Sequence, residues 1–127
     1  MAYPTPGEET MGVRQRHVTG TQEVERHYSA RHKMRVRAYL TAYPVLIPVL
    51  LEAVDYLFYL FGQNVKLTLE VVTDPEAPEE EQLFAYIEVP VEEADEAFEA
   101  LAQFDEQWFL DQQTHVNGRL IFSLNFA

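Results

Sequence analysis

The stretch 65–89, VKLTLEVVTDPEAPEEEQLFAYIEV, decides the fold expected for this chain. In its first part, 65–72, apolar and polar side chains alternate strictly, which is the pattern of a half-buried strand. The apolar run 83–89 predicts a second strand, and Pro90 ends it. Residues 73–82 hold two prolines and five acidic residues, which predicts a loop. The stretch therefore predicts a β-hairpin.

Three further elements flank the hairpin. Apolar periodicity predicts a helix over 44–61 before it and another over 91–104 after it. The turn Asn117-Gly118 leads into an alternating strand over 119–126. The second helix is a crossover, which we expect to place the last strand beside the first and antiparallel to it. We therefore expect an α+β domain with a three-stranded, antiparallel or mixed sheet of order 2-1-3 and both helices on one face.

The domain is expected to begin near residue 38. Residues 1–20 carry no periodic apolar pattern and several structure breakers, which predicts a flexible arm. Residues 21–37 are polar and could form a short helix. We therefore expect a flexible or partly helical N-terminal extension over 1–37 and a single α+β domain over 38–127.

Length and composition favour a small globular protein. The chain has 127 residues, of which 47% are hydrophobic, and this suffices for one domain with a core. The absence of Cys excludes disulfides and thiolate chemistry and fits a reducing compartment. The first ten residues show no basic region leading into an apolar stretch, so no signal peptide is evident. A cytoplasmic location is therefore expected.

The net charge of −12 is unevenly spread. Residues 1–37 hold seven Lys/Arg and four Asp/Glu, a net +3. Residues 38–127 hold two Lys/Arg and seventeen Asp/Glu, a net −15. A surface that acidic repels phosphate backbones, so the acidic domain is not expected to bind nucleic acid. A basic protein partner is possible, and solubility alone explains the charge as well.

The segment 38–61 is long and apolar enough to raise a membrane interpretation, and basic residues precede it. Glu52 and Asp55 lie near its middle, where a carboxylate costs about 2.5–3.5 kcal/mol on insertion scales. Two prolines weaken the interpretation further. We therefore expect an amphipathic helix with a wide apolar face and no membrane partner.

The segment FDEQWFLD, 104–111, is the densest candidate site, and two interpretations compete for it. In the structural one the helix breaks, Asp105 caps a new helix, and Phe104 and Phe109 form a hydrophobic staple around the cap. Trp108 is then a core anchor. We expect the break because an unbroken helix would bury the lone carboxylate of Asp105 in its apolar face, which is costly.

The chemical interpretation makes the same segment a metal or acid–base site. Its candidate residues are Asp105, Glu106, Asp111 and the nearby His115. His27 and His32 are a weaker pair, because zinc ligands on a helix are usually four residues apart and these are five apart. The chain has no Gly-rich phosphate loop and no G-x-S-x-G elbow, so no cofactor or catalytic residue is assigned.

Four motifs carry a resemblance to known proteins: the apolar helix that opens the domain, LEVVTDPE (69–76), LFAYIEV (83–89), and FDEQWFLD followed by NGRLIFSLNF (117–126). In these the chain resembles a group of short, acidic bacterial proteins that have no established activity. The resemblance covers about residues 44–126. It implies an α+β domain in a cytoplasmic protein of bacterial type, and it supplies no functional residues.

Three functions are compatible with the sequence. The first is a non-enzymatic interaction domain that forms a homodimer or larger assembly. It is favoured because one domain of this size is not expected to bury all of its apolar surface: the helix has a wide apolar face, and the far side of the sheet carries Val72, Phe84, Tyr86 and Ile121. The second is an antitoxin-like neutraliser of a basic protein partner. The third is a carboxylate-dependent metal enzyme.

Overall fold

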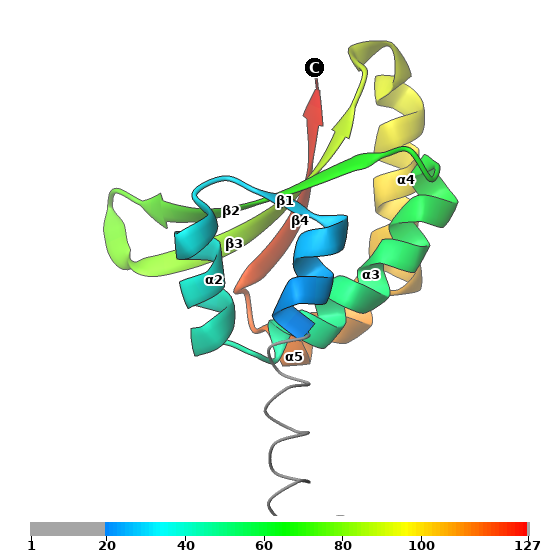
Figure 1. The fold of residues 1–127 in the computed structure, drawn as a ribbon. Coiled ribbons are helices and arrows are strands. Elements are labelled where there is room, and N and C mark those ends of the chain that lie inside the picture. Colours follow the sequence, from blue (N-terminus) through cyan, green and yellow to red (C-terminus); the bar gives the residue numbers. More distant parts are fainter. Residues whose placement is uncertain (1–19, 127) are drawn as a thin grey trace, which may run out of the picture.

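The computed structural model describes residues 20–126, which form an α+β fold (Figure 1). Residues 20–27 are helical. The elements that follow are β1 (Ser29–Ala30), α2 (Lys33–Ala42), α3 (Leu46–Phe61), β2 (Lys66–Asp74), β3 (Ala77–Val89), a 3-10 turn (Val91–Glu93), α4 (Ala94–Gln107), a second 3-10 turn (Phe109–Gln112), α5 (Gln113–Val116) and β4 (Leu120–Phe126).

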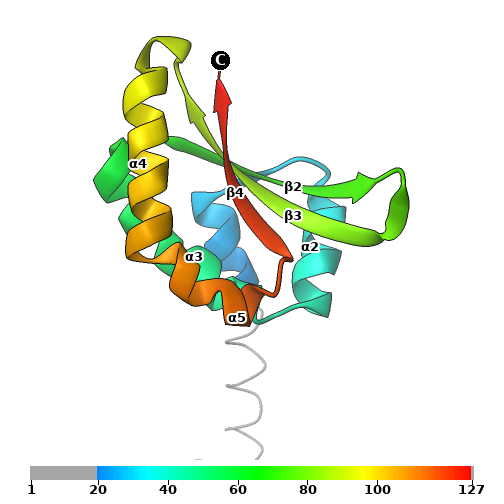
Figure 2. The same cartoon turned by 180° about the vertical axis from the view of Figure 1, so that it is seen from behind.

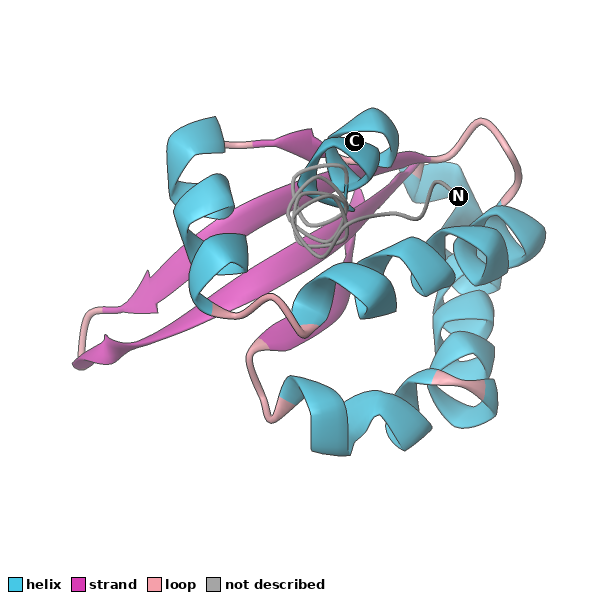
Figure 3. Ribbon diagram, turned by 60° about the horizontal axis from the view of Figure 1, so that its bottom comes forward, coloured by secondary structure: helices cyan, strands magenta, loops and turns pink. Residues whose placement is uncertain are grey.

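The strands form one four-stranded mixed sheet in the order β1-β2-β3-β4. β1 runs parallel to β2, β2 antiparallel to β3, and β3 parallel to β4. All the helices lie on one face of this twisted sheet, and the opposite face carries no described element (Figures 1 and 3). We call the uncovered side the far face.

The predicted hairpin is confirmed, and it is longer than expected. The predicted loop 73–82 is wrong, because β2 continues to Asp74 and β3 starts at Ala77. The acidic residues are tolerated in the strand because they are exposed at its outer end. Glu81 also lies across from Thr73 and accepts a 2.7 Å hydrogen bond from Arg35.

The predicted strand order 2-1-3 is wrong. The last strand pairs with β3, in parallel, and does not reach β2. That side of β2 is already occupied by β1, whose residues Ser29 and Ala30 pair with Thr68 and Leu69. The crossover through α4 therefore joins two neighbouring parallel strands, as in a βαβ unit.

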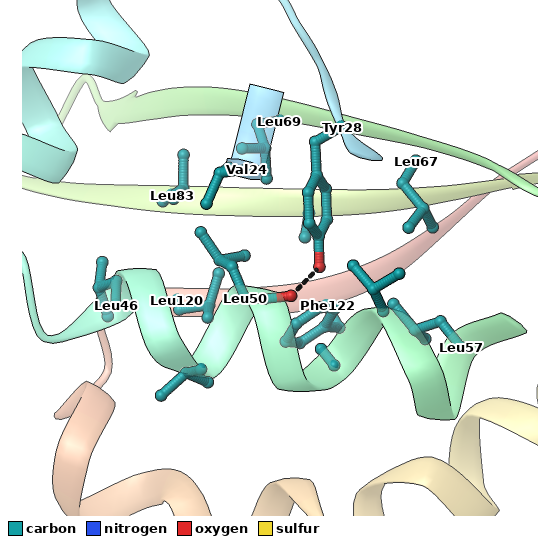
Figure 4. Close-up of a cluster of buried hydrophobic side chains, with 14 of the residues drawn as sticks. Val24, Tyr28, Leu46, Leu50, Leu57, Leu67, Leu69, Leu83, Leu120 and Phe122 are labelled. Atoms are coloured by element: carbon teal, nitrogen blue, oxygen red, sulfur yellow. Dashed lines mark hydrogen bonds between the residues drawn. The ribbon is translucent and has the colours of Figure 1, made fainter. Parts of the chain in front are cut away.

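Residues 20–37, which were expected to belong to an N-terminal extension, contribute side chains to the core. Val24, Tyr28 and Val36 are buried. The Tyr28 ring lies between the sheet and α3, and its hydroxyl donates a 2.8 Å hydrogen bond to the Leu50 carbonyl (Figure 4). Residues 1–19, where the flexible arm was expected, lie outside the described residues.

The helix predicted over 44–61 is confirmed as α3, but its apolar face is not left uncovered. Seven of its residues are buried, among them Leu46, Leu50 and Leu57, which point toward the sheet (Figure 4). The N-terminal segment, α4 and α5 also pack against α3. No single described helix is long and apolar enough to cross a membrane; α2 and α3 pass that test only as a pair, and the pair is bent by 116° at the break between them.

Candidate interaction surface

The segment 104–111 forms a corner of the core, as the structural interpretation predicts, but not through a cap. α4 continues through Asp105 to Gln107 and ends at Trp108, so the predicted break and N-cap at Asp105 are wrong. The break was expected because a fully buried carboxylate is costly, whereas Asp105 is only partly buried. The helix therefore has no reason to end there.

Aromatic rings pack tightly at this corner. Phe104 is fully buried, with its ring centroid 4.9 Å from that of Phe122 on β4. Phe109 also lies 4.9 Å from Phe122, and Trp108 stacks on Tyr56 of α3 at 5.4 Å. Trp108 is 8% exposed, which confirms it as a core anchor. The corner joins α3, α4 and β4.

The four candidate ligands are not brought together into a metal site. Glu106, Asp111 and His115 are exposed, on α4, the second 3-10 turn and α5 in turn. Within residues 20–126, no group of three or more His, Asp or Glu side chains is placed to hold a metal ion. The same holds for His27, at the end of the helical segment 20–27, and His32, which directly precedes α2.

Asp105 lies in a partly desolvated environment. Partial burial raises the pKa of its carboxyl above the ordinary value. No residue in the described part of the chain forms an ion pair with it. Desolvation without a charge partner explains the shift, and a single acid of this kind is no catalytic constellation.

The far face of the sheet carries an apolar strip. Phe84 and Tyr86 of β3 have ring centroids 5.7 Å apart, and the residues beside them on β4 are Ile121 and Ser123. Val72 adds to the strip from β2, and all five side chains are partly exposed. We call this set the far-face strip.

Arg31 borders the far-face strip on the side of β1. Its guanidinium lies 5.2 Å from the centre of the Tyr86 ring and 3.2 Å from a carboxylate oxygen of Glu70. Among the described residues it is therefore the cation that limits the strip on this side, while the β4 side has no charge. The strip opens toward β4.

A polar cavity of about 340 Å³ lies beside the outer, acidic end of the hairpin. Tyr39 and Tyr43 of α2 line it, together with the carboxylates Asp74, Glu79, Glu80 and Glu81. The Tyr39 hydroxyl donates a 3.0 Å hydrogen bond to the Glu81 carbonyl, and burial raises the pKa of its phenol. Carboxylates and aromatic rings together suit a cationic group.

Arg119 also lines that cavity. Its guanidinium lies 4.3 Å from the centre of the Tyr43 ring. The sequence reasoning did not single out Tyr39, Tyr43 or Arg119, because they come from α2 and from the turn before β4 and no spacing links them. Only the topology of the sheet brings the two segments together.

No family model matches the chain, and neither a curated protein nor a solved structure matches it. The resemblance to short, acidic bacterial proteins therefore stays a sequence-based expectation.

Proposed function

We propose that this protein is a non-enzymatic interaction domain that associates with itself. The observation that carries the proposal is the far-face strip on a sheet whose helices all lie on the other side. Apolar side chains that gather on an uncovered face usually mark an interface. Among the described residues, no group of three or more His, Asp or Glu side chains is placed to hold a metal ion.

Light scattering and sedimentation equilibrium over a wide range of protein concentration test the proposal. We expect the mean mass to rise with concentration toward twice that of one chain. Binding of an apolar dye should fall over the same range, because association covers apolar surface. A single-chain mass at every concentration, with no dye binding, contradicts the proposal.

A second candidate function is the binding of a basic protein partner. It is favoured by the cavity at the hairpin, where Glu79 and Glu80 are exposed beside Tyr39 and Tyr43. A Lys or Arg side chain that entered it would meet both carboxylates and rings.

Calorimetry with a short arginine-rich peptide at low salt tests this second function. The double variant Glu79→Gln, Glu80→Gln should weaken binding. Glu92→Gln, Glu93→Gln is the matched control, because it removes the same charge from exposed positions that do not line the cavity. Equal losses in the two variants would mean that net charge alone, and not the cavity, attracts the peptide.

A further inference from the structure

β4 is an uncovered edge of the sheet. It ends the strand order, and no described strand lies beyond it (Figure 2). The Leu83 N–H donates a 2.8 Å hydrogen bond to the Arg119 carbonyl, so the backbone of Arg119 faces β3. Backbone groups alternate in direction along a strand, so those that point away from β3 belong to Leu120, Phe122, Leu124 and Phe126.

This edge lacks the features that normally prevent strand pairing between chains. Natural edge strands are protected by short length, charged side chains, proline or a bulge. β4 has seven residues, none of them charged and none a proline, and its register with β3 is continuous. The opposite edge is β1, which has only two residues.

Exposed aromatic side chains flank the free edge. Phe126 at the end of β4 is 37% exposed, and Phe98 on α4 is 57% exposed. Their ring centroids are 5.6 Å apart. The pair forms an apolar shoulder at the end of β4 on the helix side of the sheet.

Charge and symmetry favour a second copy of this chain as the occupant of the edge. Copies that each carry a net charge of −12 repel one another, and they approach at least cost through an uncharged strand. An antiparallel pair of β4 strands centred on Ser123 matches all seven residues of one copy with seven of the other. Such a two-fold contact is self-complementary, and it closes because only the short β1 edges remain outside.

We propose that two copies pair through β4, antiparallel and centred on Ser123, which joins their two four-stranded sheets into one. The contact rests on the proposed self-association and places it at the β4 edge, toward which the far-face strip opens, rather than on the strip itself. Both far-face strips then lie on the same side of the joined sheet. The outward backbone groups of each β4 find partners on the other copy.

Disulfide trapping tests the contact, because the chain has no Cys of its own. In this register Ser123 faces its counterpart in a non-hydrogen-bonded pair, whose Cα atoms are about 4.5 Å apart and within the range of a disulfide. Ser29→Cys on the opposite edge is the matched control for Ser123→Cys. Thiols held together react at an effective concentration of roughly 1 mM, so at ~10 µM protein we expect Ser123→Cys to cross-link about 100-fold faster than the control.

A mixed pair tests the register. Ile121 of one copy is expected to face Asn125 of the other. A mixture of Ile121→Cys and Asn125→Cys chains should therefore form the mixed disulfide much faster than either variant cross-links with itself. Circular dichroism of each reduced variant checks that the fold is kept.

The outcomes separate this inference from the proposed function. A dimer in light scattering with equally slow cross-linking of Ser123→Cys and Ser29→Cys would overturn the β4 contact while self-association stands. Fast Ser123→Cys cross-linking with no preference for the mixed pair would overturn the antiparallel register. A single-chain mass at all concentrations would overturn the proposed function itself.

Discussion

Asp105 illustrates how the environment of one residue decides between structure and chemistry. Its carboxyl is partly desolvated and its pKa is raised, so folding disfavours the charged form. The folded chain therefore binds this proton more tightly than the unfolded chain does. The resulting penalty is fully present above the folded-state pKa and disappears as the pH falls below the unfolded value.

We therefore expect Asp105→Asn to raise the melting temperature at pH 7, because it removes the charge and keeps the shape. The advantage should shrink as the pH is lowered toward about 3, where Asp105 of the wild-type chain becomes protonated in the unfolded as well as in the folded state. Glu106→Gln, at an exposed neighbouring position, is the control and should change little. If Asp105→Asn is destabilising at pH 7, the charge is used by the fold or by a ligand.

Phe104 gives a second prediction at the scale of one residue. Its ring is fully buried and contacts three other aromatic rings, on Trp108, Phe109 and Phe122. Phe104→Ala should lower the free energy of unfolding by about 3–5 kcal/mol, the usual cost of truncating a buried aromatic ring. Leu110→Ala is the control: its side chain is 60% exposed, so urea unfolding should change by less than about 0.5 kcal/mol.

Among the elements, the N-terminal segment contributes more to the stability of the fold than its polar sequence indicates. Residues 20–37 contribute three buried side chains, the β1 pairing, and the 2.8 Å ion pair of Arg37 on α2 with Glu25 in the preceding helical segment. The Arg37 hydrogen bond lowers the pKa of Glu25. The buried side chains and the β1 pairing tie the segment to the rest of the domain, whereas the ion pair joins two parts of the segment itself.

A chain that begins at Ala38 is therefore expected not to fold. Burial of each apolar side chain contributes about 1.5–3 kcal/mol, so losing Val24, Tyr28 and Val36 removes roughly 5 kcal/mol or more. That is comparable to the whole stability of a small domain, about 5–15 kcal/mol. Circular dichroism and thermal unfolding check this.

Tyr28→Phe is the control. It removes only the hydrogen bond to Leu50, so it should stay folded and lose about 1 kcal/mol of stability. A cooperatively folded chain from Ala38 would show that the segment is dispensable.

The elements also show what the sequence could predict. Strict alternation was sufficient to predict β2, and apolar periodicity was sufficient to predict α3 and α4, because each pattern reports one buried face. β1 has two residues and no period, so its pairing with β2 was invisible, and the strand order was wrong as a consequence. In the candidate site, burial of Trp108 was predictable from its type, whereas the cavity and the exposed pair Phe98 and Phe126 depend on topology.

At the scale of the whole molecule, charge and apolar surface are separated. The acidic residues gather on the hairpin and on α4, while β4 carries no charge and the far-face strip opens toward it. A strongly acidic protein stays soluble because its copies repel one another. The uncharged edge is then where copies can meet, and association at that edge is opposed by the charge of the remaining surface.

Added salt is therefore expected to affect the two candidate functions in opposite directions: it should tighten self-association and weaken binding of a basic partner. Raising the ionic strength from about 0.01 M to 0.15 M shortens the Debye length from about 30 Å to 8 Å. The repulsion between two copies weakens, while the backbone and apolar contacts at β4 carry no charge to be screened, so the dimer should become tighter. A basic peptide at the hairpin should bind more weakly over the same range, because its attraction is electrostatic. Sedimentation equilibrium for the dimer and calorimetry for the peptide measure the two dissociation constants. A dimer that dissociates as salt is added would mean that opposite charges meet in its interface, for instance the net positive residues 1–37 of one copy and the acidic domain of the other.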